Sequence, residues 1–317
     1  MMLAPIVIFI YNRAEEFRNC LLSLTENSEF TESNLIIFAD GAKPNATETD
    51  LENIQKTRNV LNEREWSKNI QLFVRQSNMG LSESIIQGVK QVLAVYNCVI
   101  VLEDDLLCGR FFLKYMNDAL QKYEFNDNIA QVSGFMYPLN IKPKNESFFM
   151  PLTTTLGWGT WKRVWDNIDF YPTDIHLLHE NKKLRKRFDL DGHYPYYKML
   201  CNQLNNSKYG SWGILFYWDV FKAGRFTVHP DYSLVQHRDK KMLGTHSANY
   251  NFLDHKNWDN NYAIDTFFEK IVINDKYFYK IKKYVGFYNS NIVRVLKYVK
   301  TPKTLFIKIK SNFTKKK

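Results

Sequence analysis

Residues 98–105 read C-V-I-V-L-E-D-D, a short apolar run that ends in three consecutive carboxylates. A run this rich in β-branched residues is typical of a strand that is buried on both faces of a parallel sheet. In open α/β sheets, ligands bind at the carboxyl ends of the strands. Hard oxygen ligands in that position suit Mg²⁺ or Mn²⁺. A solvated acidic turn would place the same three residues there, so both interpretations remain open at this point.

The segments around this run show the same alternation of strands and helices. Further apolar strands are predicted at residues 5–10, 35–39, 70–74 and 129–132, and helices at about 14–24 and 111–123. Strands and helices that alternate at this spacing indicate crossover connections and a mostly parallel sheet flanked by helices. We therefore predict a Rossmann-like α/β fold.

Length and composition favour an ordinary folded protein. The chain has 317 residues, 45% of them hydrophobic, which is enough for one large domain or two unequal ones. No run of about 18 apolar residues exists, and the N-terminus resembles a first strand rather than a signal peptide. The four cysteines lack metal-ligand spacing, which favours reduced thiols in a cytoplasmic protein.

The positive charge is concentrated at the C-terminus. Residues 276–317 hold thirteen Lys and Arg and no acidic residue, so the net charge of +10 leaves residues 1–275 slightly negative. This distribution argues against a nucleic-acid-binding groove in the main domain. Lysines mixed with aromatic residues in this tail indicate an anionic membrane surface as partner, here the inner face of the plasma membrane. A disordered solubilising tail and an RNA-binding arm are the alternatives.

A second basic stretch lies at residues 181–187, which read N-K-K-L-R-K-R. Such a run is either a patch that steers a phosphate-bearing acceptor or a solvated helix face. We favour the solvated helix face.

Two familiar phosphate-binding loops are missing from the sequence. No G-x-G-x-x-G follows the first strand, and no G-x-x-x-x-G-K-[ST] occurs. A sheet that binds a nucleotide without either loop has to hold the diphosphate by another route. A divalent cation bound by residues 103–105 is the available one.

Five motifs in series resemble the GT-A class of nucleotide-sugar glycosyltransferases. They are Y-N-R at 11–13, A-D-G at 39–41, R-Q-S-N-M-G-L-S at 75–82, V-L-E-D-D-L at 101–106 and F-F-L-K-Y-M at 111–116. The chain is most similar to bacterial family-2-like enzymes and to the N-acetylglucosaminyltransferase I type, over roughly residues 4–250. The resemblance implies an inverting, metal-dependent transfer of a sugar from a UDP donor to a surface-glycan or lipid-linked acceptor.

The resemblance also implies roles for single residues. Nucleotide-sugar contacts would come from the ends of the strands, namely Tyr11, Arg13, Asp40, Asn78, Gly80, Glu103 and Asp104. Asp105 would coordinate Mn²⁺ or Mg²⁺, and His246, in L-G-T-H-S, would be a further metal ligand. For His246, an ordinary surface position is an equal alternative.

The acceptor side of the site is expected in residues 153–165, which read T-T-T-L-G-W-G-T-W-K-R-V-W. In the resembled families this segment borders the acceptor pocket, which points to Gly157 and Trp158. Tryptophan faces suit the apolar C–H faces of sugars. Trp165 is predicted to be a core residue.

The general base is the weakest point of the resemblance. Inverting relatives carry an aspartate where this chain reads Y-G-S-W-G at 209–213, with no carboxylate. The nearest substitutes are Asp219 and, just upstream, Asp189 and Asp191. We favour Asp191.

The predicted organisation is a GT-A domain over residues 1–250, with a nucleotide-sugar half at 1–135 and an acceptor half at 136–250, followed by an extension at 251–317. Two other functions remain open. A nucleotidyltransferase shares a similar sheet but usually has a glycine- and lysine-rich loop that is missing here. A degenerate, non-catalytic relative would explain the missing base.

Overall fold

The computed structural model describes residues 3–205, 211–237, 253 and 255–289. The chain divides into two compact units, a larger one of residues 1–174 and 199–274 and a smaller one of residues 175–198 and 275–317. Residues 175–198 thus group with the C-terminal segment, whereas the predicted domain of residues 1–250 had included them.

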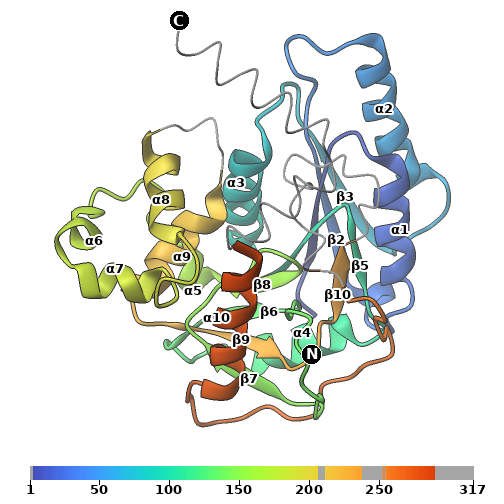
Figure 1. Ribbon diagram of the computed structural model, residues 1–317. Helices are drawn as coiled ribbons and strands as arrows, with labels where there is room; N and C mark the ends of the chain where they lie inside the picture. The colour runs from blue at the N-terminus through green and yellow to red at the C-terminus, as the bar shows by residue number, and fades with distance from the viewer. Residues whose placement is uncertain (1–2, 206–210, 238–252, 254, 290–317) are drawn as a thin grey trace, which may run out of the picture. The chain divides into compact units, whose positions relative to one another are not determined.

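The larger unit is built on a sheet that, within the described residues, has eight strands in the order β3-β2-β1-β4-β8-β6-β9-β7 (Figure 1). These strands are β1 Ile6–Ile10, β2 Asn34–Ala39, β3 Asn69–Val74, β4 Cys98–Glu103, β6 Ile129–Ser133, β7 Ser147–Met150, β8 Trp158–Trp161 and β9 Phe226–Pro230. Strands β1 to β4 run parallel to one another, as do β6 and β9, while β8 and β7 run antiparallel to their neighbours. The predicted α/β class with a mostly parallel sheet is confirmed.

A small antiparallel ribbon joins β5 (Leu106–Cys108) to β10 (Val235–His237). The helices are α1 Ala14–Leu24, α2 Glu48–Asn59, α3 Leu81–Leu93, α4 Phe112–Lys122, α5 Lys162–Trp165, α6 His176–Glu180, α7 Lys182–Phe188, α8 Tyr196–Asn205, α9 Trp212–Lys222 and α10 Asp275–Asn289. Thr47 caps the N-terminus of α2, and its side chain and that of Asp50 form a capping box that satisfies two otherwise unpaired backbone N–H groups.

Two neighbouring residues of β8 show that helices cover both faces of the sheet. The indole of Trp158 packs against Trp212 of α9, with 4.8 Å between ring centroids. A Cβ atom on Gly159 would point instead at Met116 of α4. Because successive side chains of a strand point to opposite faces, α9 and α4 lie on opposite sides of the sheet.

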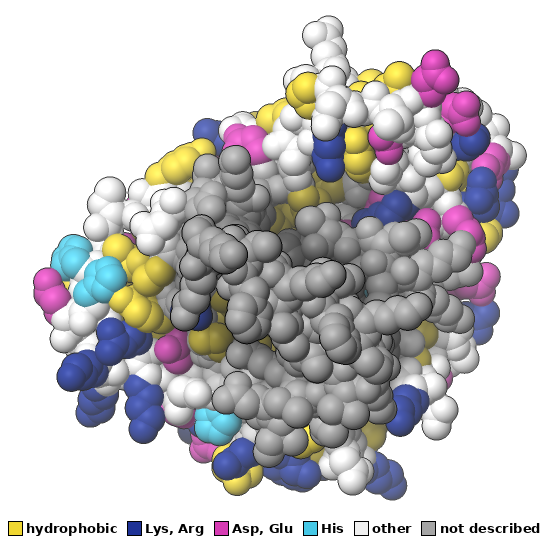
Figure 2. Space-filling model, turned by 45° about the horizontal axis from the view of Figure 1, so that its top comes forward, with side chains coloured by type: hydrophobic (Ala, Val, Ile, Leu, Met, Phe, Trp, Pro, Cys, Tyr) yellow, Lys and Arg dark blue, Asp and Glu magenta, His cyan; other side chains and the backbone are white. Residues whose placement is uncertain are grey.

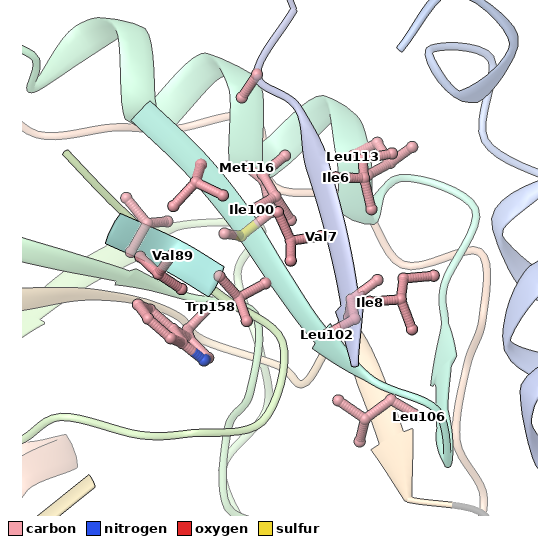
Figure 3. Close-up of a cluster of buried hydrophobic side chains, with 14 of the residues drawn as sticks. Ile6, Val7, Ile8, Val89, Ile100, Leu102, Leu106, Leu113, Met116 and Trp158 are labelled. Atoms are coloured by element: carbon pink, nitrogen blue, oxygen red, sulfur yellow. The ribbon is translucent and has the colours of Figure 1, made fainter. Parts of the chain in front are cut away.

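Strands β1 and β4 form the centre of the core. Ile6, Val7, Ile8 and Ile100 have no exposed surface, and Figure 3 shows them with labelled side chains from β8 (Trp158), α3 (Val89) and α4 (Leu113 and Met116). Burying a side chain of this size contributes about 1.5–3 kcal/mol. The core therefore fixes the positions of the residues that follow these two strands.

His229 in β9 makes the stability of the fold depend on pH. The imidazole is 1% exposed, its Nε2–H donates to the carbonyl of Leu152 at 2.9 Å, and it stacks on Phe148. Burial lowers the pKa of His229 from 6.5 to about 4, because the charged form would lose its hydration.

The folded-state pKa of His229 lies below the unfolded one, so its contribution is complete above pH 6.5 and is lost as the pH falls towards 4. At pH 5, the protein is expected to lose about 2 kcal/mol of unfolding free energy through this residue. His229→Gln keeps an N–H donor but cannot titrate. Urea unfolding at pH 7 and pH 5 should show a smaller loss for this variant than for the wild type, and equal losses would contradict the assignment.

No helix in the described part of the chain is long and apolar enough to cross a membrane. All four cysteines are free thiols, and Cys20 and Cys108 are buried. Burial raises the pKa of the Cys20 and Cys108 thiols well above the usual range, so both are unreactive at neutral pH.

Candidate functional site

The carboxyl ends of β2, β1 and β4 lie side by side, so the loops that follow them converge (Figure 1). Arg13 comes from the loop after β1, and Asp104 and Asp105 follow β4. The guanidinium of Arg13 donates to Asp104 Oδ1 and, at 2.6 Å, to Asp105 Oδ2. Both carboxylates are nearly buried, with side-chain exposures of 2% and 7%. The structure thus brings three of the predicted site residues into direct contact.

His237 completes this group, and it was not predicted from the sequence. The β5–β10 ribbon pairs His237 with Leu106, the residue directly after Asp105. As a result, His237 Nε2 lies 3.2 Å from Asp105 Oδ2. The sequence holds only a weak local signal for this residue, which is a histidine at the end of the short segment L-V-Q-H at 234–237. The predicted metal ligand His246 lies outside the described residues.

The three carboxylates differ in their tendency to ionise. Burial raises the pKa of Glu103 and of Asp104, and repulsion from Asp105 raises each further. Burial acts on Asp105 in the same direction, but the hydrogen bond from His237 and the charge of Arg13 outweigh it, so the pKa of Asp105 is lowered. Asp105 is therefore the carboxylate of this cluster that holds its negative charge most firmly.

The positions of Asp105 and His237 fit a divalent cation. Two neighbouring ligands of an octahedral ion, each about 2.1 Å from it, lie about 3.0 Å apart. The measured separation between Asp105 Oδ2 and His237 Nε2 is 3.2 Å. Nowhere among the described residues do three His, Cys, Asp or Glu side chains form a metal-binding group. The arrangement therefore suits an ion that takes its remaining ligands from phosphate oxygens and water.

Asp40 has a different environment from the one expected. Its Oδ1 accepts hydrogen bonds from the backbone N–H groups of Gly41 and Met79, both at 2.9 Å, and its Oδ2 accepts from Gly80 at 3.0 Å. Asn78 adds a hydrogen bond from its side-chain amide to the carbonyl of Gly41. Asp40, Asn78 and Gly80 are thus brought together, and they hold the loop after β2 against the loop after β3.

The close approach of these two loops explains the glycine at position 41. A Cβ atom there would lie 2.4–2.6 Å from the backbone of Ser77, which real Cβ atoms essentially never approach. Gly80, with φ +77, adopts a left-handed conformation that favours glycine. Both glycines are therefore required by backbone geometry.

An Asp40→Ala variant tests whether Asp40 is structural or binds the nucleotide. Loss of the carboxylate leaves three backbone N–H groups without their acceptor, so we expect unfolding free energy to fall by about 2–3 kcal/mol. Asp166→Ala, which removes an exposed i,i+4 partner of Lys162, should lower it by less than about 0.5 kcal/mol. Urea unfolding and UDP titration separate the roles. Normal stability with weakened UDP binding would show that Asp40 contacts the ligand instead.

Tyr11, at the end of β1, is partly exposed beside the same loops. Burial raises the pKa of its phenol, and the ammonium of Lys43 lies 5.8 Å from its ring centroid. The ring therefore lies near a positive charge, and its role in nucleotide binding stays a prediction.

The acceptor residues expected from the sequence are closely packed. Trp158 is 1% exposed and stacks among Trp165, Trp212 and Phe216. Its face is covered by protein, so a sugar platform at Trp158 is not supported, whereas the core position predicted for Trp165 is confirmed. Gly157 has φ +56, and a Cβ atom there would lie 2.7 Å from Val235.

Two of the three base candidates, Asp219 and Asp191, engage in ion pairs. Asp219 is 7% exposed and lies 3.4 Å from Lys222, seven residues along α9 from Trp212. Asp191 belongs to the smaller unit, where its Oδ2 lies 2.6 Å from Lys282 Nζ. Neither contact involves Arg13 or the acidic cluster, so the identity of the base stays a prediction.

One protein-family model matches most of the chain. The model of "Glycosyl transferase family 2" matches residues 6–232, which is more than half of the sequence. No curated protein matches the chain significantly.

Solved structures give weaker, partial matches. TarS of S. aureus, residues 1–349, is 17% identical over 55% of this chain and 51% of its own, with a TM-score of 0.37, and one of its structures contains UDP. Glucosyl-3-phosphoglycerate synthase from Mycobacterium tuberculosis, in complex with Mn²⁺, UDP and phosphoglyceric acid, is 9% identical over 54% of this chain and 60% of its own, with a TM-score of 0.32. The chain thus spans about half the length of the TarS structure that it matches.

Proposed function

Because the chain belongs to glycosyl transferase family 2, and is therefore a glycosyltransferase, we propose that it transfers a sugar from a nucleotide diphosphate donor in a metal-dependent reaction. The observation that supports this most directly is the pair Asp105 and His237 at the carboxyl end of β4, spaced as neighbouring ligands of one ion. The sequence resemblance implies UDP as the nucleotide, inversion at the sugar, and a surface-glycan or lipid-linked acceptor. These finer points are part of the proposal.

Each residue of the site would have a distinct role in the reaction. Asp105 and His237 would hold Mn²⁺ or Mg²⁺ in place. Arg13 would move from the carboxylates towards the phosphates once the cation neutralises Asp105, because its guanidinium forms strong bidentate contacts with phosphate. The loops held by Asp40 would shape the floor under the nucleotide. The cation would supply a positive charge that stabilises the diphosphate as the glycosidic C–O bond breaks.

Removing the histidine provides the test of this site. His237→Gln is expected to weaken Mn²⁺ binding in the presence of UDP by at least about 10-fold, since it removes one of two protein ligands. Titration calorimetry measures this directly, with no need for an acceptor. His176→Gln, an exposed histidine in α6, is the matched control and should bind Mn²⁺ as the wild type does. Equal affinities for both variants would rule His237 out as a ligand.

A non-catalytic relative is the second candidate, because the sequence lacks a carboxylate at residues 209–213, where inverting relatives carry the base. Assays with several UDP-sugars and Mn²⁺, following both hydrolysis and transfer, distinguish the two. Tight binding of UDP and Mn²⁺ without any turnover would favour the non-catalytic protein. The family match makes a nucleotidyltransferase the less favoured enzyme.

We also propose that the protein works at the inner face of the plasma membrane, where a lipid-linked acceptor would be found. The support is the composition of residues 276–317, which mixes lysines with aromatic side chains. No role for nucleic acid is proposed.

A further inference from the structure

The smaller unit contains the excess positive charge of the protein. Its residues, 175–198 and 275–317, carry 19 Lys and Arg against 4 Asp and Glu, while the larger unit carries 24 against 29. Within the described part, residues 175–198 and 275–289 alone have 10 basic and 4 acidic side chains. The basic stretch in α7 and the C-terminal helix α10 are therefore parts of one basic unit, which the sequence alone does not reveal.

Specific contacts fix α10 to the turn that follows α7. Lys282 of α10 pairs with Asp191 at 2.6 Å. A Cβ atom on Gly286 would lie 2.9 Å from the ring of His193, so only glycine permits the helix to come this close. The turn itself has three successive left-handed residues, with φ +50 at Leu190, +59 at Asp191 and +87 at Gly192. Two of these are not glycine, which indicates that the surrounding contacts impose the conformation.

Helix α10 has a buried face and an exposed aromatic face. Tyr277, Ile281 and Val285 recur every four residues and are buried. On the opposite side, Tyr279 is 58% and Phe287 57% exposed. Residues four apart on a helix form one stripe, so exposed Lys283 lies between them. Large aromatic side chains alternating with lysine on an exposed stripe are typical of helices that lie in a membrane interface.

Helix α7 supplies cations that face solvent. Lys182, Lys183, Lys186 and Arg187 are exposed, while Phe188 is buried and anchors the end of the helix. In Figure 2, Lys and Arg side chains lie at several places around the visible face, and one group of them lies near His side chains at the left. These four side chains are solvent-exposed, as predicted for a solvated helix face, and α7 belongs to the same compact unit as the basic helix α10.

We propose that α7 and α10 together form one docking surface for anionic phospholipid, with α7 supplying charge and the exposed stripe of α10 inserting aromatic side chains. This inference rests on the proposed membrane association and extends it from the C-terminal tail, which includes most of α10, to helix α7. The charge of the unit complements an anionic bilayer, where each lysine near the surface strengthens binding by about five-fold.

Vesicle co-sedimentation of the full chain tests the surface. Lys183→Gln with Lys186→Gln is expected to lower partitioning onto phosphatidylcholine vesicles containing phosphatidylglycerol by about 30-fold. The control, Lys142→Gln with Lys270→Gln, makes the same charge change at exposed sites of the larger unit and should have less than about a two-fold effect. Tyr279→Ser with Phe287→Ser should also reduce partitioning, with an effect that high salt leaves unchanged. Circular dichroism confirms that each variant is folded.

Recovery of the α7 variant equal to that of its control would overturn the proposal. So would binding of single-stranded RNA without binding of vesicles, which would identify a polynucleotide as the partner. The assay needs no sugar transfer. A protein that binds vesicles but transfers no sugar would refute the proposed function alone, and one that transfers sugar but ignores vesicles would refute this inference alone.

Discussion

Asp105→Asn is expected to lower the rate of sugar transfer by on the order of 10³-fold. The amide keeps the shape of the side chain but lacks the negative charge that Asp105 retains more firmly than Glu103 and Asp104. A cation bound without this charge would stabilise the departing diphosphate far less. Initial rates with a UDP-sugar and Mn²⁺ measure the effect, and thermal unfolding followed by circular dichroism shows that the variant is folded.

Asp174→Asn is a matched control for this experiment. Asp174 is also an aspartate in an ion pair, 2.7 Å from Lys222. Burial raises its pKa, but hydrogen bonds from Lys222 and Trp218 outweigh burial, so the pKa of Asp174 is lowered, like that of Asp105. The substitution changes the net charge equally but leaves the acidic cluster intact, so transfer should remain within about two-fold of the wild-type rate. Near-normal transfer by Asp105→Asn would refute the metal site at the end of β4.

Arg13→Met is expected to destabilise the protein in the absence of metal by about 3 kcal/mol. The guanidinium bridges Asp104 and Asp105, and its loss leaves two buried carboxylates without their positive partner. A divalent cation can replace the missing charge, so Mn²⁺ should raise the melting temperature of the variant by more than that of the wild type. Thermal unfolding with and without Mn²⁺ provides the measurement.

Arg18→Met separates this effect from the general loss of an arginine. Arg18 forms an ion pair with Glu63, but the two side chains are 37% and 38% exposed. Exposed pairs contribute about 0–1 kcal/mol, so this variant should lose little stability. Mn²⁺ should raise its melting temperature by no more than it raises that of the wild type. If Mn²⁺ stabilises wild type and Arg13→Met equally, Arg13 does not compete with a cation for these carboxylates.

Local sequence was sufficient to predict the sheet and the acidic end of β4. The runs at residues 6–10, 35–39 and 99–102 are apolar at every position, which is typical of strands that are buried on both faces of a parallel sheet. Parallel strands also place their carboxyl ends at one edge. Arg13 and Asp105, which are 92 positions apart, could therefore be assigned to the same site before their contact was seen.

The direction of a polar side chain could not be predicted in the same way. Asp40 follows its strand as expected, but its carboxylate points at the N–H groups of Met79 and Gly80 because the two loops pack at backbone contact distance. Trp158 lies in the expected segment, yet three other aromatic rings cover it. Both outcomes depend on neighbours that come from other parts of the chain.

The sequence by itself determined strands β1, β2, β3, β4 and β6 and the carboxylates at the end of β4, since each follows from the short-range hydrophobic pattern. Only the tertiary structure decided that His237 meets Asp105 and that α10 meets the turn after α7. The physical reason is the same in both cases. An antiparallel ribbon and a glycine that allows close helix packing join segments that are far apart in the sequence, and nothing in the local pattern of either segment specifies its partner.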